Sequence, residues 1–127
     1  MTIDELTEKV IGGAYRVHNE LGVGFLEKVY ENALRIELGE AGLAVKQLHP
    51  IPVRYHGEVV GDFYADLKIE DRLIVELKAV QALAKEHEVQ LVNYLAATGI
   101  DNGLLINFGP SVEVKRKFRV YKKREDE

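Results

Sequence analysis

The 127-residue sequence contains no cysteine. This absence excludes disulfides, thiolate zinc sites, thiol catalysis and iron–sulfur clusters. No apolar run approaches the roughly 20 residues that a membrane-spanning helix needs, so we expect no membrane segment. The first ten residues, MTIDELTEKV, lack the basic and apolar segments of a secretory signal, which predicts a cytoplasmic protein. The length fits a single domain, predicted to span residues 1–127.

An excess of positive charge is also missing, since the formal net charge is −4. This balance does not by itself indicate a nucleic-acid-binding protein. The charge is unevenly distributed, however, because residues 115–124, KRKFRVYKKR, hold seven of the 17 basic residues and no acidic one. The alternative to a functional role is that these charges keep an edge strand and tail (112–127) soluble. The functional interpretation is a strip that contacts phosphates through Lys115, Arg116, Lys117 and Arg119.

Hydrophobic periodicity outlines three helices and six short strands. Apolar residues three or four apart predict helices over 3–20, 26–40 and 82–97. Alternation and turn residues predict strands over 44–47, 51–55, 58–69, 72–79, 103–108 and 112–121. The order α-α-β-β-β-β-α-β-β predicts an α/β fold in which helices flank a mixed sheet.

Charged residues interrupt two of the predicted strands, although strands are normally poor in Asp, Glu and Lys. Asp66 lies in the strand over 58–69, and Glu76 and Lys78 lie in the strand over 72–79. A tight turn at Glu70-Asp71 would join the strands, so Asp66 and Glu76 are expected to lie nearly opposite each other. Two opposed carboxylates repel, and a divalent cation such as Mg²⁺ would remove that repulsion. Lys78 could then orient or deprotonate a water that attacks a phosphodiester.

An exposed sheet face with a cross-strand salt bridge is the alternative to this site. The Glu-x-Lys spacing alone is weak evidence, because it occurs twice, at Glu76–Lys78 and at Glu113–Lys115. The first copy has a strand Asp ten residues before it and an apolar frame, LIVELKAV, that implies burial on at least one face. The second copy lies in the basic edge strand. The surroundings of the first copy therefore make it the candidate site.

The sequence resembles the GxxExxY proteins, a branch of the PD-(D/E)XK nuclease superfamily. The segment GFLEKVYENAL carries Gly24, Glu27 and Tyr30 at the spacing of the family motif, and the blocks DFYADL, VELKAV and QLVNYL are similar to the family as well. The resemblance covers roughly residues 5–120. It implies a restriction-endonuclease-like fold and a metal-dependent nuclease. Ala65 stands where the superfamily name has Pro, a position that is not a ligand.

The resemblance implies a role for each matching residue in the hairpin. Asp66 and Glu76, with the carbonyl of Leu77 and with Glu27 from the second helix, would bind Mg²⁺ or Mn²⁺. Lys78 would be the catalytic lysine. From the residues alone, Glu27 has another explanation, because Glu is favoured in the first turn of any helix.

Two further segments match the family. Gln90 and Tyr94 fit the Gln-x-x-x-Tyr motif of RecB-type nucleases, which implies that Gln90 serves the site and that Tyr94 contacts nucleic acid. A half-buried Tyr with a Gln hydrogen bond explains the same spacing without a ligand. Tyr30 would likewise shape the pocket or contact nucleic acid. His18 would lie at the site rim, or alternatively at a helix cap or core edge.

The expected substrate is DNA, hydrolysed with little sequence specificity, because no base-reading element can be recognised. The alternative function is a non-catalytic adaptor that keeps the nuclease fold and binds nucleic acid or protein. A chain this short has little surface outside the site, so a homodimer or a protein partner is compatible with it.

Overall fold

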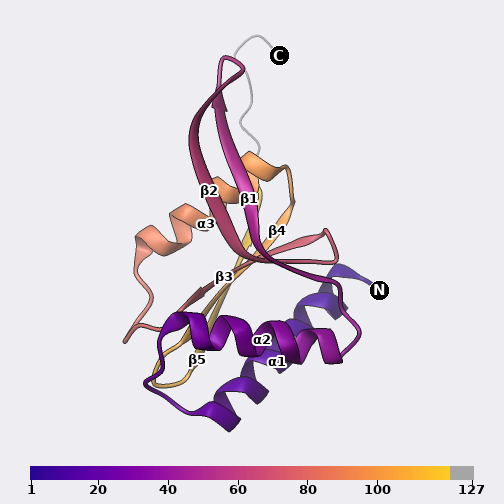
Figure 1. Ribbon diagram of the computed structural model, residues 1–127, viewed down its shortest axis with the longest axis vertical. Helices are drawn as coiled ribbons and strands as arrows, with labels where there is room; N and C mark the ends of the chain where they lie inside the picture. The colour runs from indigo at the N-terminus through magenta and orange to yellow at the C-terminus, as the bar shows by residue number, and fades with distance from the viewer. Residues whose placement is uncertain (121–127) are drawn as a thin grey trace.

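The computed structural model describes residues 1–120, so the last part of the predicted basic tail, residues 121–127, lies outside the described residues. Within the described part, no helix has the length and apolarity that crossing a membrane requires. The elements follow in the order α1 (Ile3–Leu21), α2 (Glu27–Glu40), β1 (Val45–Tyr55), β2 (Glu58–Ile69), β3 (Leu73–Lys78), α3 (Lys85–Thr98), β4 (Asn102–Phe108) and β5 (Val112–Phe118) (Figure 1).

The five strands form one sheet whose spatial order follows the chain, β1-β2-β3-β4-β5. Neighbouring strands are antiparallel except β3 and β4, which are parallel and are connected through α3. Helices α1 and α2 lie together, and α3 lies apart from them beside the strands (Figure 1). A mixed sheet flanked by helices confirms the predicted α/β fold class.

Each side of the sheet carries its own apolar core. The larger core joins α1 and α2 to strand residues such as Leu77, and the smaller one joins α3 to residues such as Ile74. Successive side chains of a strand point to opposite faces, so β3 contributes to both cores. Glu76 lies two residues after Ile74 and therefore falls on the side of α3. This alternation brings a carboxylate into the interior of the molecule.

The predicted strands over 44–47 and 51–55 form one continuous strand, β1, so the sheet has five strands instead of six. Pro50 and Pro52 lie within β1 and are paired with β2. The strand can accept them because it is at the edge of the sheet. The nitrogens of two prolines two residues apart point to the same side of the strand. When that side faces away from β2, the prolines remove no hydrogen bond from the ladder.

Helix α3 begins at Lys85, three residues later than predicted, because tertiary hydrogen bonds hold the segment before it. The Asn107 side chain donates to the Val80 carbonyl and accepts from the Val80 N–H, both at 2.9 Å. The Leu83 N–H donates to the Glu113 carboxylate at 3.4 Å. These bonds hold the segment in a non-helical path against β4 and β5.

A two-stranded arm extends from the sheet. Strand β2 pairs with β3 only over Leu67–Ile69, whereas its pairing with β1 continues to the turn at His56-Gly57. Residues 50–64, called the arm below, therefore project beyond the other strands (Figure 1). Asp66 lies where the arm leaves the sheet.

Candidate active site

Asp66 and Glu76 meet where β2 and β3 separate. The backbone ladder between these strands ends at the Leu67–Val75 pair, and the two carboxylates replace the bonds that would follow. The Asp66 N–H donates to Glu76 Oε1 at 3.1 Å, and the Leu77 N–H donates to Asp66 Oδ2 at 2.8 Å. The hairpin thus places Asp66 opposite Glu76, as its register predicts.

The two carboxyl groups share a poorly solvated environment. Glu76 is only 7% exposed and Asp66 is half-buried. Burial, reinforced by the negative charge of Asp66, raises the pKa of Glu76 to about 9. Burial also raises the pKa of Asp66 to about 6, although the Leu77 N–H opposes this change. Like charges in close contact cannot both be ionised cheaply, so without a cation the pair retains a proton at neutral pH.

Lys78 supplies positive charge to this pair. Its side chain is half-buried on the same face of β3 as Glu76, and its charge lowers the pKa of both Asp66 and Glu76. Lys78 lowers the pKa of Glu76 by less than burial raises it, so one lysine does not offset the negative charge of the site. A second cation would be favourable there.

Helix α2 brings two more acidic residues toward Asp66. Glu27 is the first residue of α2, and Glu31 follows one turn later with 2% exposure. The charge of Glu31 raises the pKa of Asp66, and that of Glu27 does so less strongly. The Glu31 carboxylate accepts hydrogen bonds from Lys28, at 2.8 Å, and from the Gln47 amide.

Glu27 was predicted from the sequence as a site residue, whereas Glu31 was not. The spacing of four residues was an available signal, because it puts both side chains on one face of the helix. Burial of Glu31 depends on contacts with β1 that no local pattern reveals. Across residues 1–120, no group of three or more His, Cys, Asp or Glu side chains converges on one potential metal position. The Asp66–Glu76 pair is therefore the compact acidic centre, and Glu27 lies near it without joining it.

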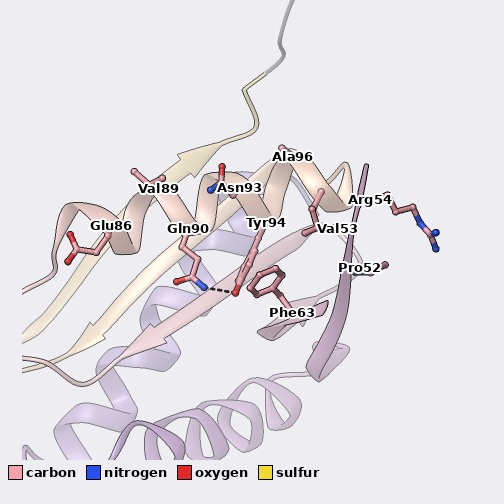
Figure 2. Close-up of a pocket in the computed structure, with 11 residues that line it drawn as sticks. Pro52, Val53, Arg54, Phe63, Glu86, Val89, Gln90, Asn93, Tyr94 and Ala96 are labelled. Carbon is pink, nitrogen blue, oxygen red and sulfur yellow. Dashed lines mark hydrogen bonds between the residues drawn. The ribbon is translucent and has the colours of Figure 1, made fainter. Parts of the chain in front are cut away.

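Helix α3 covers the other side of the pair. The Gln90 amide donates to the Tyr94 hydroxyl at 2.6 Å, as Figure 2 shows. Tyr94 is largely buried, and Gln90 is exposed. Burial raises the pKa of Tyr94, and the charges of Glu76 and Asp66 raise it further. Tyr94 also packs in the same apolar core as Ala65 and Ile74, which are close in sequence to Asp66 and Glu76, so the predicted Gln-x-x-x-Tyr pair lies near the acidic centre.

A groove of about 960 Å³ runs between the arm and α3 (Figure 2). Phe63 from β2 and Tyr94 from α3 form part of its lining, and their ring centroids are 5.9 Å apart with the planes tilted by 45°. We call this space the arm groove. It is lined by Pro52, Val53, Arg54, Phe63, Glu86, Val89, Gln90, Asn93, Tyr94, Ala96 and Ala97.

Tyr30 and His18 have structural contacts. Tyr30 is 1% exposed, its hydroxyl donates to the Gly22 carbonyl at 2.6 Å, and its ring stacks on Phe108 at 4.7 Å. Its burial contradicts the predicted contact with nucleic acid, because a ligand cannot reach the ring. His18 Nε2 donates to the Gly109 carbonyl at 2.9 Å and so supports the turn after β4.

Successive side chains of β5 point to opposite faces of the sheet, which divides the predicted basic strip between those two faces. Arg116 pairs with Asp4 of α1 at 2.9 Å, and Lys117 pairs with Glu88 of α3 at 2.5 Å. These helices lie against opposite faces of the sheet, so the predicted strip is not one continuous surface. Arg119 pairs with Asp101 at 2.9 Å. Strand β5 is also separated from β3 by β4, so the strip does not adjoin the acidic pair through the sheet.

Comparisons with known proteins agree with this architecture. Residues 4–119 match the family model of the PD-(D/E)XK nuclease superfamily. No curated protein matches the chain. The crystal structure of SSO0001 is similar at 18% identity and a TM-score of 0.58, over 75% of this chain and 50% of that one. An alkaline exonuclease (LHK-Exo) from Laribacter hongkongensis is similar at 16% identity and a TM-score of 0.55, over 73% and 56%. The chain thus spans about half the length of either structure, and at these identities the likeness shows the fold.

Proposed function

This chain belongs to the PD-(D/E)XK nuclease superfamily, and from that premise we propose that it is a divalent-metal-dependent nuclease that hydrolyses phosphodiester bonds. The observation that carries the proposal is the buried Asp66–Glu76 pair. Two carboxyl groups with raised pKa values lie in contact at a break in the sheet, with Lys78 beside them. An ordinary structural site would pair each carboxylate with its own cation.

The pair has the chemistry of a site for Mg²⁺ or Mn²⁺. Each carboxylate commits one oxygen to a backbone N–H, which orients it and leaves the second oxygen as a candidate ligand. All donors are hard oxygens, which suit these cations. The Leu77 carbonyl would be a third donor. Glu27, which lies near the pair without joining it, would complete the proposed donor set when a cation binds. A bound cation would polarise a phosphoryl oxygen and make a water more acidic.

Lys78 and Gln90 would act on the substrate. The Lys78 ammonium would hydrogen-bond to the attacking water or to a phosphate oxygen and stabilise the negative charge that develops there. Gln90 is oriented by its bond to Tyr94, and its amide would hold the water or a second phosphate oxygen. Both residues lie on the α3 side of the acidic pair, which supports a substrate approaching from that side.

We also propose that the chain belongs to the GxxExxY branch, and the support is that each motif position has a physical explanation in this fold. Gly24 has φ of +99°, a conformation that favours glycine. Glu27 starts α2 near Asp66, and Tyr30 holds the preceding loop through Gly22. The three motif positions thus turn the chain, present an acid and fix the turn. The proposed substrate is DNA, hydrolysed with little sequence specificity.

A cleavage assay with isosteric variants tests the proposal. Labelled single-stranded DNA, duplex DNA and RNA are incubated with Mg²⁺, Mn²⁺ or EDTA. Asp66→Asn, Glu76→Gln and Lys78→Met should each reduce cleavage at least about 100-fold, because each removes a charge that acts on the reacting phosphate. Asn and Gln can still accept the backbone N–H bonds, so the fold should be kept.

Glu113→Gln is the matched control, because Glu113 belongs to the second Glu-x-Lys copy and keeps its bond to Leu83 as Gln. This variant should cleave like the wild type. Absence of cleavage by the wild type in every metal would contradict the nuclease and favour the adaptor. Equal cleavage by all variants would place the activity outside these residues.

A further inference from the structure

The arm groove has a lining that differs from an ordinary phosphate-binding surface. Of its eleven residues, one is cationic, Arg54, and one is anionic, Glu86. The Arg54 side chain extends away from α3 (Figure 2). The remaining lining is apolar, aromatic or amide. A duplex is bound mainly through its phosphates by several Lys and Arg side chains, and this groove does not offer them.

Phe63 presents an aromatic ring to the groove. The side chain is 44% exposed although its ring contacts Tyr94. Gly61 lies beside the ring on the same strand, and a Cβ at Gly61 would come within 2.9 Å of it. The missing side chain of Gly61 therefore allows the Phe63 ring to lie along the arm. An exposed aromatic ring of this kind is a stacking surface for a nucleobase.

The groove is continuous with the candidate active site. Tyr94 lines the groove and packs in the same apolar core as Ala65, the neighbour of Asp66, so the same side chain adjoins both regions. Gln90 also lines the groove and bonds to Tyr94. A chain that occupies the groove would reach the acidic pair at one end.

We infer that the arm groove binds the unpaired bases of a single-stranded nucleic acid and delivers that strand to the Asp66–Glu76 pair. The inference rests on the proposed nuclease function and specifies its substrate. Bases in a duplex are stacked on each other and cannot stack on Phe63, whereas an unpaired base can. The amide of Asn93 offers hydrogen bonds to the edge of an unpaired base.

Binding in EDTA tests this inference separately from cleavage. Fluorescence anisotropy is measured with labelled single strands of about 12 nucleotides, as DNA and as RNA, and with a duplex of the same length. The wild type should bind the single strands more tightly than the duplex. Phe63→Ala should weaken single-strand binding roughly 5- to 150-fold, the range that base–aromatic stacking covers. The DNA and RNA arms identify which sugar the groove prefers.

Tyr64→Ala is the matched control. Tyr64 is the next residue of β2, is 57% exposed, and points to the opposite face of the arm, so its removal should leave binding unchanged. Gly61→Ala is a second test variant, because it displaces the Phe63 ring without removing it and should also weaken binding. Circular dichroism melting verifies that all three variants fold.

Salt dependence provides a further criterion. Arg54 is the one cation of the lining, and each phosphate contact on a single strand contributes about −0.7 to the slope of the logarithm of the binding constant against the logarithm of salt concentration. The expected slope is therefore about −0.7. A slope of about −3 or steeper would overturn the inference, as would tighter binding of the duplex or unchanged binding by Phe63→Ala. If the protein cleaves nucleic acid but gives one of these three binding results, the groove inference fails and the nuclease proposal stands. If binding depends on Phe63 but no cleavage occurs, the nuclease proposal fails and the binding role of the groove stands.

Discussion

Two charged regions of the same sheet differ in how their charges are compensated. On β2 and β3, the like charges of Asp66 and Glu76 lie together in the interior, and burial raises the pKa of Glu76. On β5, Lys117 bonds to Glu88 and lowers the pKa of that carboxyl. Both regions contain a Glu-x-Lys sequence, so the sequence motif is the same and the electrostatic environment is opposite.

We interpret the difference as one between ion pairs that support the fold and an acidic pair that we propose to be functional. Ion pairs on β5 satisfy each other at the surface and need no ligand. When both carboxyl groups of the acidic pair are ionised, their negative charge exceeds the positive charge of Lys78. A buried excess charge is costly, so the pair retains a proton unless a cation binds there. The contrast can be tested by changing the charges of each region in turn.

The largest expected effect is on the pH dependence of stability. Since the pKa values of Asp66 and Glu76 are raised in the native state, the native state binds more protons than the unfolded chain at intermediate pH. The free energy of unfolding in EDTA should therefore fall as the pH rises from about 4 through about 9, by up to about 1.4 kcal/mol per pH unit for each group that is protonated in the native state alone. Glu76→Gln should remove most of this slope. Urea unfolding at pH 5, 7 and 9 measures it.

The Ala variant at the same position distinguishes charge from hydrogen bonding. At pH 8, Glu76→Gln should be more stable than the wild type by several kcal/mol, because the amide cannot ionise in the unfolded chain and still accepts from the Asp66 N–H in the native state. Glu76→Ala loses that acceptor, which costs about 1–3 kcal/mol. Glu113→Gln should keep the wild-type slope. A wild type whose stability does not depend on pH would contradict the shared-proton description.

An intermediate effect is expected from divalent cations. Mg²⁺ or Mn²⁺ at about ten times its dissociation constant should raise the free energy of unfolding of the wild type by about 1.4 kcal/mol at pH 8. The gain should disappear in the variant with both Asp66→Asn and Glu76→Gln, which has no charge to bind the ion. Thermal unfolding with and without metal gives the comparison. An undiminished gain in that variant would place the cation elsewhere, and a smaller gain in Glu27→Gln would support Glu27 as a ligand.

The smallest effect is expected on β5. In a double-mutant cycle of Asp4→Asn and Arg116→Met, the coupling free energy should be about 0.5 kcal/mol, as is usual for exposed ion pairs, and should decrease with added salt. Urea unfolding of the four proteins provides the measurement. A coupling above about 2 kcal/mol would mean that β5 depends on its charges as strongly as the acidic pair does, and the contrast between the regions would be lost.

Local patterns predicted most of the fold. The helices α1 and α2 and the strand β2 begin and end within one residue of their predicted bounds, because each has a strong period and clear turn residues at its ends. Two misjudged elements, β1 and α3, depend on their neighbours, and β5 ends at Phe118 instead of at residue 121. Pro50 and Pro52 fit within β1 because it is an edge strand, and α3 starts late because Asn107 and Glu113 hold the segment before it.

The site was predictable in the hairpin and much less so outside it. The turn at Glu70-Asp71 sets the register, and register alone brings Asp66 opposite Glu76. Glu31 was not predicted, because its burial depends on contact with Gln47, which lies in β1. The basic residues of β5 read as a free strip because their partners on α1 and α3 are remote in sequence.

The sequence by itself determined the elements, the hairpin register and the identity of the acidic pair, since all three depend on residues close together in the chain. Only the tertiary structure decided which charges remain uncompensated. Burial and the approach of α2 raise the pKa of Asp66, ion pairs occupy β5, and the packing of α3 beside the arm creates the groove. Electrostatic energies depend on distance and solvation in space, and neither is encoded by spacing along the chain.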